Sequence, residues 1–292
     1  MRIGVLGNEG SWYVERLCAA AADRGHLAAE LRFPEQAPAI IDGETELQIG
    51  EVNAGKLDAI IVRTMPPGSL EQVVTRMNFL AVAALEGVDI VNPPRAIECA
   101  VDKYLTTQKL ALAGLPVPDT IVCEDAETAL AAFEKLGRDV VVKPLFGAEG
   151  RGILRVAHPE MALRVFRTLE RIDSVIYLQK FNKGPREDIR VLLLDGQLIG
   201  SIKRRATGDD FRANVAQSGT AEPWSPTETE LQLSLAAAKA TGCLFCGVDI
   251  MYCAQGTPLV IEVNAVPGWR ALQKVTNIDV ADRFIEWLEN RN

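Results

Sequence analysis

Short apolar runs alternate with segments whose apolar residues recur at helical spacing over the first part of the chain. The runs predict strands at 3–6, 59–63 and 89–92, and the periodic segments predict helices at 12–24 and 69–86. The second helix begins at Ser69, with Gln72 at the spacing of a capping box, and it ends at Gly87. Because strand and helix alternate, residues 1–95 are predicted to form an open parallel α/β domain.

Strands follow one another more closely in the rest of the chain. Residues 96–182 are predicted to form an α+β unit, with a helix from the cap Asp102 to Gly114, helices at 126–136 and 160–171, and strands at 120–122, 139–144, 153–156 and 175–181. Residues 183–292 are predicted to form a mixed-sheet domain, with strands at 189–194, 198–203, 245–251 and 259–264, a turn at Asp195-Gly196, a helix capped by Thr227 and Glu230, and a last helix from about 280.

Composition narrows the class of protein. The chain has 292 residues, 48% of them hydrophobic, which is enough for the cores of two or three domains. The net charge of −8 argues against a general nucleic-acid binder. No apolar stretch approaches the ~20 residues that span a bilayer, and the N-terminus has the pattern of a strand and not of a signal peptide, so we expect a cytoplasmic protein without membrane contacts.

The cysteines carry little functional signal. Cys243 and Cys246 form a CxxC, but there is no second pair, and His26 and His158 lie far from it in the sequence. Since a structural zinc site usually needs four ligands, we expect reduced cysteines that pack in the interior, with a redox or zinc role as the alternative.

Oxygen-bearing side chains interrupt two apolar runs near the C-terminus. Glu262 and Asn264 stand two apart in the run 260–268, so on a strand both side chains leave the same face. Asp249 lies in a second such run, 246–251. A carboxylate in an apolar run is costly unless something pairs with it. If the two strands pair, three oxygen ligands converge and can hold a hard cation such as magnesium with a bound nucleotide.

A glycine-rich loop follows the strand that ends at Lys143. Gly147, Gly150 and Gly152 leave the backbone N–H groups of this loop accessible to an anion, and Lys143 can reach the same phosphates. A plain hairpin loop is the alternative for this segment. Lys103, after the helix cap, is on its own an ordinary surface lysine, and the backbone near Lys180 can meet an adenine edge.

Basic residues cluster between 190 and 212 in an otherwise acidic chain. The cluster consists of Arg190, Lys203, Arg204, Arg205 and Arg212. Guanidinium groups suit carboxylate and phosphate, so the cluster predicts a pocket for an anionic substrate, with a solvated face as the alternative.

Taken in order, these motifs resemble the ATP-grasp superfamily and, over nearly the whole chain, its RimK-type amino-acid ligases. The resemblance is carried by Asp102-Lys103, Lys143 with the glycine loop, 188–190, 203–204, 211–214, 247–249, 262–264 and 267–268. The segments 63–71, 92–98 and 264–269 resemble the tetrahydromethanopterin α-L-glutamate ligases in particular. The implied architecture is an ATP-grasp fold, with the N-terminal α/β domain (1–95), a central lid (96–182) and a C-terminal domain with the metal site (183–292).

The resemblance implies ATP-driven ligation of L-glutamate to a carboxylate of a small-molecule acceptor, a pterin cofactor, through an acyl phosphate. Asp249, Glu262 and Asn264 would hold Mg²⁺ or Mn²⁺. The implied nucleotide ligands are Lys103, Lys143, Gly147, Gly150, Arg151, Gly152, Gln179, Lys180, Phe181 and Asp188. The implied substrate and phosphoryl ligands are Arg190, Lys203, Arg212 and Asn214. Trp269 and Arg270 are candidates for substrate contacts, and packing is the alternative for Trp269.

Several alternatives stay open. RimK-type enzymes usually have Glu where Lys180 stands, so a side-chain role at that position would change nucleotide preference. A ligase of the same mechanism that modifies a protein C-terminus or another cofactor has the same phosphate and metal residues. Two further readings are a non-catalytic nucleotide-binding protein and a dinucleotide-dependent oxidoreductase, the latter resting on the loop 7–10, which lacks the GxGxxG spacing. Homo-oligomerisation is also left open.

Overall fold

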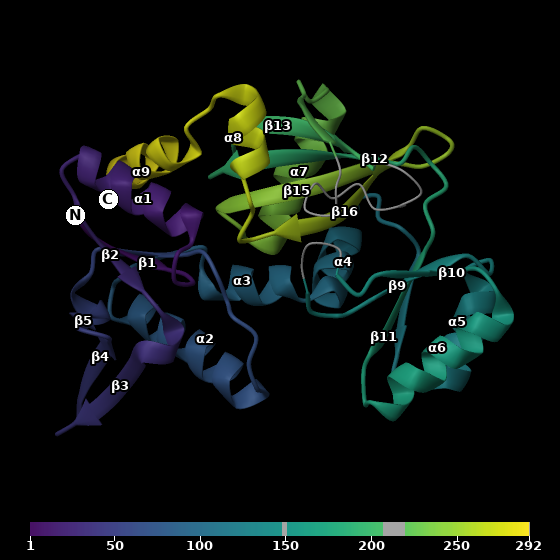
Figure 1. Cartoon of the computed structure of the whole chain (residues 1–292), viewed down its shortest axis with the longest axis horizontal. Coiled ribbons are helices and arrows are strands. Elements are labelled where there is room, and N and C mark those ends of the chain that lie inside the picture. Colours follow the sequence, from purple (N-terminus) through teal and green to yellow (C-terminus); the bar gives the residue numbers. More distant parts are fainter. Residues whose placement is uncertain (148–150, 207–219, 292) are drawn as a thin grey trace.

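The computed structural model describes residues 1–147, 151–206 and 220–291. Three main sheets and their covering helices lie in a row, with the N-terminal sheet at one end and the central sheet at the other (Figure 1). Each main sheet takes its strands from one of the three predicted segments. The segment boundaries themselves remain a prediction, and the one at 95 falls inside the helix α3 (Pro94–Val101).

The N-terminal sheet is parallel, as the alternation of strands and helices predicts. Its order is β2 (Leu27–Leu31), β1 (Arg2–Leu6), β6 (Ala59–Val62) and β7 (Asp89–Val91). Alternate residues of β1 enter different cores: Ile3 and Val5 pack with α1 (Trp12–Asp23) and α9 (Val280–Arg291), whereas Leu6 packs with α2 (Leu70–Leu85). The sheet is therefore covered on both faces.

The sequence pattern misses part of this domain. Besides β2, it misses a small antiparallel sheet of β3 (Gln36–Ile41), β4 (Glu44–Ile49) and β5 (Val52–Asn53), with short 3-10 turns at Phe33–Glu35 and Ala54–Lys56. Most of the β3 and β4 side chains are exposed or only partly buried, so these strands carry little apolar alternation.

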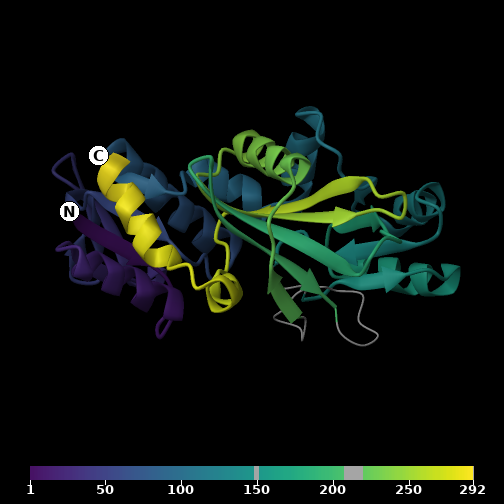
Figure 2. The same ribbon diagram turned by 90° about the horizontal axis from the view of Figure 1, so that it is seen from above.

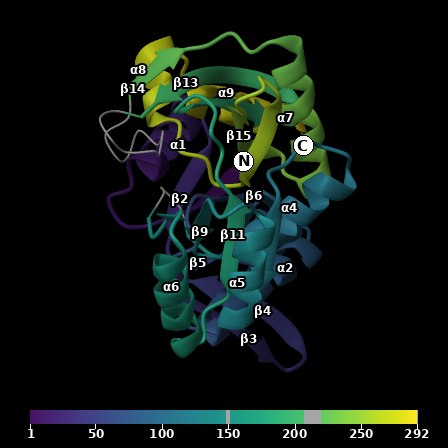
Figure 3. The same ribbon diagram turned by 90° about the vertical axis from the view of Figure 1, so that its right-hand side faces the viewer.

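The central sheet is antiparallel and is covered by helices on one face only. Its order is β10 (Leu154–Val156), β9 (Val140–Lys143), β11 (Ile176–Lys180) and β8 (Thr120–Cys123), and its helices are α5 (Ala126–Lys135) and α6 (Pro159–Arg171). Phe133 and Phe166 from the two helices close this core against Leu178. In Figure 3 the helices α5 and α6 lie on the near side of this sheet, and the C-terminal domain lies above it.

The C-terminal sheet is antiparallel and has the order β14 (Thr220–Pro223), β13 (Gln197–Arg205), β12 (Glu187–Leu194), β15 (Phe245–Tyr252) and β16 (Pro258–Asn264). One face packs on α7 (Glu228–Thr241) and on α4 (Lys103–Leu112). The Thr227–Glu230 capping box starts α7, and Gly242, with a φ of 76°, ends it. The short helix α8 (Arg270–Thr276), which was not predicted, lies against β13 and β14.

The chain returns to its starting point at the end. α9 packs beside α1 on the N-terminal sheet, so the two termini lie at the same end of the molecule (Figure 2). Arg24, the C-cap residue of α1, forms ion pairs with Asp282 and Glu289 of α9. In the described residues we find no helix with the length and apolar character that a membrane span requires.

Candidate active site

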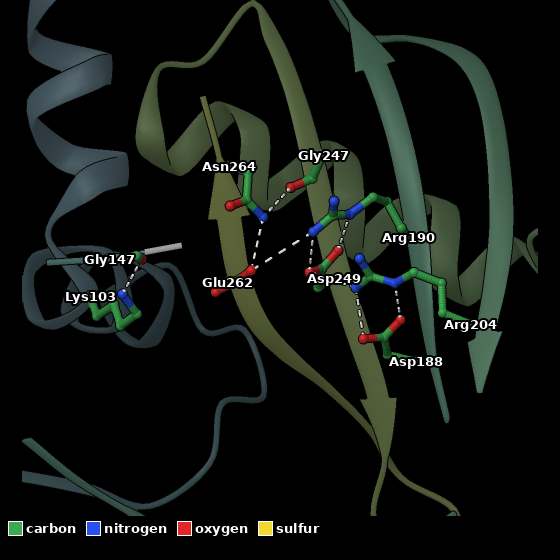
Figure 4. A network of polar contacts seen from close by, with 9 residues as sticks. All are labelled: Lys103, Gly147, Asp188, Arg190, Arg204, Gly247, Asp249, Glu262 and Asn264. Atoms are coloured by element: carbon green, nitrogen blue, oxygen red, sulfur yellow. Dashed lines mark hydrogen bonds and ion pairs between the residues drawn. The ribbon is translucent and has the colours of Figure 1, made fainter. Parts of the chain in front are cut away.

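The predicted acidic group forms on β15 and β16. Val248 and Ile250 point into the core, so Asp249, between them, emerges on the opposite face of the sheet, where it lies directly across from Glu262. Asn264 shares the face of Glu262, because its side-chain amide donates to Glu262 Oε1 at 3.0 Å (Figure 4). The strand pairing thus brings the three side chains together, as the spacing in the sequence predicts.

Two arginines neutralise Asp249. Arg190 of β12 donates to both carboxylate oxygens, at 2.7 and 2.6 Å, and Arg204 of β13 donates to Oδ2 at 2.9 Å (Figure 4). Arg204 also holds Asp188 with two hydrogen bonds of 2.6 and 2.7 Å. Burial by itself would raise the pKa of Asp249, but the two guanidinium groups outweigh it and hold that pKa well below its usual value. Asp249 is therefore an anion despite being buried.

The donor set fits a hard divalent cation. Among the described residues no group of three or more His, Cys, Asp or Glu side chains is placed to hold a metal, so this set consists of two carboxylates and one amide. Oxygen donors of this kind suit Mg²⁺ or Mn²⁺. Asp249 Oδ2 already accepts from two guanidinium groups, whereas Oδ1 accepts from Arg190 only, so Oδ1 is the oxygen that keeps an acceptor position for a cation.

Two lysines stand opposite the acidic group. Lys143, at the end of β9, donates to Gln179 Oε1 at 2.7 Å. Lys103, at the start of α4, donates to the Gly147 carbonyl at 2.7 Å (Figure 4). Burial lowers the pKa of Lys143 to about 8, and the negative charge of Glu262 opposes this shift. Burial also lowers the pKa of Lys103, again against the field of Glu262. A polyanion between the lysines and the acidic group would stabilise the charged lysines.

The space between the two lysines and the acidic group is the cleft of this site, and the alternation of β11 decides which predicted nucleotide ligands face it. Gln179 bonds to Lys143, whereas Leu178, on the other face, is part of the core under α5 and α6. Lys180 shares the face of Leu178, and its Nζ forms an ion pair with Asp119 at 3.1 Å. Its side chain therefore points away from Lys143, so the prediction that residue 180 lines an adenine pocket depends on its backbone groups.

The backbone N–H groups at the end of β11 already have hydrogen-bond partners. The N–H groups of Lys180 and Phe181 donate to the carbonyls of Asp119 and Asp139, each at 2.9 Å. An adenine edge at these two residues would thus meet carbonyl oxygens and not N–H groups. Arg155, which the sequence analysis did not select, stacks on the ring of Phe181 with its guanidinium carbon 3.7 Å from the ring centroid.

Lys203 is the second predicted residue that does not reach the cleft. Its neighbour across the sheet is Ile189, a core residue on the face covered by α7. The Nζ of Lys203 lies 3.6 Å from the centroid of the Trp224 ring and pairs with Glu187. The next residue, Arg204, has the opposite orientation and takes the place in the cleft.

The remaining predicted residues lie in or near the glycine loop and the basic segment. Gly147 and Gly152 have φ values of 144° and 73°, conformations that favour glycine, and Arg151 between them is exposed. Gly150, Arg212 and Asn214 fall outside the residues that the structure describes.

Comparison with known proteins connects this site to a family. The family described as RimK-like ATP-grasp domain matches residues 100–288. The chain is 31% identical to a tetrahydromethanopterin:α-L-glutamate ligase of Methanosarcina acetivorans, with 99% of each chain covered. It is 32% identical to the protein of the same name in Methanococcus maripaludis, covering 98% of this chain and 97% of that one. A ribosomal protein bS6–L-glutamate ligase of Escherichia coli is 30% identical over 99% of this chain and 96% of its own.

Solved structures agree in fold. The ATP-grasp ligase PsnB, complexed with a minimal precursor, has a TM-score of 0.78 at 21% identity, with 99% of each chain covered. A RimK domain ATP-grasp protein from Sphaerobacter thermophilus has a TM-score of 0.77 at 22% identity, covering 98% of this chain and 99% of that one. At these identities the likeness speaks for the fold alone.

Proposed function

Because this chain belongs to the RimK-like ATP-grasp family, we propose that it attaches L-glutamate to a carboxylate of a pterin cofactor of the tetrahydromethanopterin type. The chain is an ATP-dependent carboxylate–amine ligase that forms ADP and phosphate. The observation that carries the proposed acceptor is the full-length similarity to two archaeal pterin ligases at 31% and 32% identity.

The chemistry needs an activated carboxylate, since oxide is too poor a leaving group for an amine to displace. In the proposed reaction an acceptor carboxylate oxygen attacks the γ-phosphorus of ATP, the bond to ADP breaks, and an acyl phosphate forms. The glutamate amine then attacks the acyl carbon, loses a proton and expels phosphate, which leaves an amide. The protein contributes mainly position and charge stabilisation.

The residues of the cleft suit this chemistry. Lys103 and Lys143 would neutralise phosphate charge, and their lowered pKa values reflect burial without a bound anion. Asp249, Glu262 and Asn264 would hold a divalent cation, which when bound supplies positive charge to the β- and γ-phosphates. Arg190 and Arg204 keep Asp249 ionised and fix its orientation. Roles for Arg212 and Asn214 at the transferred phosphoryl group rest on the family resemblance.

A protein tail is the second candidate acceptor. The bS6 ligase of Escherichia coli is almost as similar, at 30% identity, and the phosphate and metal residues do not separate the two acceptors. A ligase for either acceptor would need the same cleft.

Mass spectrometry tests the acceptor. The protein is incubated with ATP, Mg²⁺ and L-glutamate, and in parallel reactions with the pterin substrate or with a peptide ending in the bS6 C-terminus. We expect the mass of one or more glutamyl residues to be added to the pterin together with ADP release. If only the peptide is modified, the acceptor is a protein C-terminus and not a pterin. A Glu262→Gln variant, which lacks one proposed cation ligand, serves as the inactive control.

A further inference from the structure

Arg63 stands at the point where the N-terminal sheet changes winding direction. β1 connects through α1 to β2 on one side, whereas β6 pairs with the other side of β1, so the crevice between the ends of β1 and β6 is the switch point of this parallel sheet. Arg63 directly follows β6, and its N–H donates to the carbonyl of Leu6, the last residue of β1, at 2.7 Å. Open parallel sheets bind ligands at such a position.

The guanidinium of Arg63 is buried without an anion. The residue is 5% exposed, and its Nη2 donates to the Pro267 carbonyl at 2.6 Å. Its Nε and Nη1 have no hydrogen-bond partner within the described residues, and neither does the buried Nε1 of Trp269. The guanidinium carbon lies 4.4 Å from the centroid of the Trp269 ring and 5.1 Å from that of Tyr13. Unpaired N–H groups of two side chains thus gather in one aromatic cluster.

Among the described residues no carboxylate pairs with Arg63, and its guanidinium lies among the rings of Tyr13, Phe245 and Trp269. Burial lowers the pKa of Arg63 to about 9, against a smaller opposing contribution from Tyr13, and the side chain remains cationic at neutral pH. The two arginines of the cleft differ, because Arg190 and Arg204 each bind a carboxylate through two nitrogens. Those two are already neutralised by carboxylates, whereas two buried nitrogens of Arg63, Nε and Nη1, have no hydrogen-bond partner among the described residues. Such a site is needed, since glutamate carries two carboxylates and the acceptor at least one.

The start of α1 adds to the preference for an anion. Its N-cap Ser11 makes no side-chain capping bond, so the first N–H groups of this 12-residue helix lack that partner. Trp12 and Tyr13, in the first turn, are only partly buried, which leaves this side of the cluster in contact with solvent. The helix start and the arginine favour the same charge.

The cluster is continuous with the catalytic cleft. Pro267, which accepts the hydrogen bond from Arg63, follows the strand that carries Glu262 and Asn264. A Cβ on Gly247 would lie 3.1 Å from Pro267 and 3.5 Å from Arg190, so the residue that accepts from Arg63 and the arginine of the cleft both lie against Gly247. A substrate with two carboxylates or a long tail can span the two arginine sites.

We propose that Arg63, with the N-terminal turn of α1, binds a carboxylate of one of the two organic substrates, a specificity site separate from the phosphate and metal ligands. The inference rests on the proposed function for its choice of ligand. The carboxylate is that of the incoming glutamate or one on the acceptor tail, and both present the same chemistry to the guanidinium.

Ligand binding tests this site without turnover. The full-length protein with ADP and Mg²⁺ is titrated calorimetrically with sodium glutarate, and the uncharged dimethyl glutarate serves as the control ligand. We expect glutarate to bind and dimethyl glutarate not to bind. Arg63→Gln should weaken glutarate binding about ten- to a hundredfold, the range for the loss of hydrogen bonds to a charged group. Glutarate affinity unchanged in Arg63→Gln would overturn the proposal.

Arg76→Gln is the matched control variant. Arg76 is also a buried arginine of this domain, 6% exposed, that donates to a proline carbonyl, Pro66, at 2.7 Å and lies over an aromatic ring, Phe33. None of its nitrogens is among the buried unpartnered atoms of the described residues. If Arg63 binds the carboxylate, glutarate binding weakens in Arg63→Gln and not in Arg76→Gln. If both arginines have a purely structural role, glutarate binding falls equally in the two variants, and that result contradicts the proposal.

Hydrogen exchange of the wild-type protein covers the case in which Arg63→Gln does not fold. Glutarate should slow exchange in peptides that contain residues 7–13 and 265–269, and absence of protection in both would also overturn the proposal. Saturating L-glutamate then identifies the source of the carboxylate. Loss of the glutarate effect assigns the site to glutamate, and persistence assigns it to the acceptor. If the protein binds glutarate at Arg63 but never forms an amide, the site stands and the proposed function fails.

Discussion

At the scale of single residues, Asn92 connects the N-terminal and C-terminal domains. Its side-chain amide donates to the carbonyls of Phe245 and Ala265, at 2.7 and 2.6 Å, and its Oδ1 accepts from the N–H groups of Leu244 and Phe245. The residue is 2% exposed, so water does not replace these partners. One buried side chain thus satisfies four backbone groups at the two ends of the hairpin that carries the acidic group.

Replacing Asn92 with Ala should therefore cost far more than a typical polar substitution. Each buried backbone group left without a partner costs roughly 1–3 kcal/mol, so we expect the free energy of unfolding to fall by about 3 kcal/mol or more. The shift of the denaturant midpoint measures this. Asn290→Ala, which removes an exposed bond to the Glu286 carbonyl, should change stability by less than about 0.5 kcal/mol. Equal effects of the two variants would contradict this account of Asn92.

Lys143 should make nucleotide binding depend on pH. Its pKa of about 8 lies below that of a free lysine, so between pH 8 and 10.5 the unfolded chain binds more protons than the folded one, and the penalty for burying this charge disappears as pH rises through that window. A bound triphosphate favours the charged lysine and raises its pKa again. We expect ATP binding at about pH 8.5 to take up a proton and affinity to fall as pH rises.

Calorimetry in two buffers with different ionisation enthalpies counts that proton. Lys143→Gln should abolish most of the uptake, and Lys103→Gln should retain the Lys143 part. Undiminished uptake in Lys143→Gln would assign the titration to another group.

Single residues also show where sequence reasoning stops. The spacing of Glu262 and Asn264, and the run around Asp249, correctly predicted that these side chains meet, because strand alternation is visible in the sequence. The substrate role predicted for Lys203 came from the family resemblance, and in the structure Lys203 lies on the face covered by α7, since nothing in the basic segment shows which of two adjacent residues faces that helix. The position of Arg204 in the cleft is visible only in the structure, where its guanidinium donates to Asp188.

At the scale of elements, three of the predicted helices begin with a cap that is visible in the sequence. Ser69 with Gln72, Thr227 with Glu230, and Asp102 all accept the expected hydrogen bonds at helix starts. The helix α8 begins at Trp269 without a side-chain cap, and α3 follows directly on Pro93-Pro94, which reads as a strand break. The edge strand β14 and the exposed hairpin of β3 and β4 lack a clear apolar face. Capping chemistry is local and readable, whereas these elements depend on tertiary contacts.

The helix α9 is held by its apolar face rather than by its ion pairs. Phe284 is 1% exposed and packs edge-on against Phe245, with ring centroids 5.0 Å apart. Phe284→Ala should lower the free energy of unfolding by about 3–5 kcal/mol. Asp282→Asn removes the ion pair with Arg24. Because the Asp282 side chain is half exposed, this change should have a small effect on the free energy of unfolding. A larger loss from Asp282→Asn than from Phe284→Ala in denaturant titrations would reverse this ranking.

At the scale of the whole molecule, the interior is divided differently from the sequence. The two larger cores each mix N-terminal and C-terminal residues: Leu6 with Val248 in one, and Ile3 with Phe245 in the other. The residues of the third core all come from the part of the chain that runs from β8 to β11, and α5 and α6 cover this core. The N-terminal and C-terminal domains thus share their interior, whereas the central unit has a core of its own.

The central unit should therefore unfold independently of the rest. All four tryptophans, at 12, 224, 269 and 287, lie outside residues 116–182. Their fluorescence therefore reports only the N-terminal and C-terminal domains, whereas far-UV circular dichroism reports these domains and the central unit. Phe133→Ala, in the central core, should remove about 3–5 kcal/mol from that unit and move part of the dichroism transition, with the tryptophan midpoint unchanged. Phe284→Ala should move the tryptophan midpoint instead. A tryptophan midpoint that follows Phe133→Ala would mean that the molecule unfolds as one body.

ADP with Mg²⁺ should stabilise both units in the wild-type protein. If the nucleotide binds as proposed, between Lys143 on the central sheet and Asp249 on the C-terminal sheet, it binds only when both units are folded.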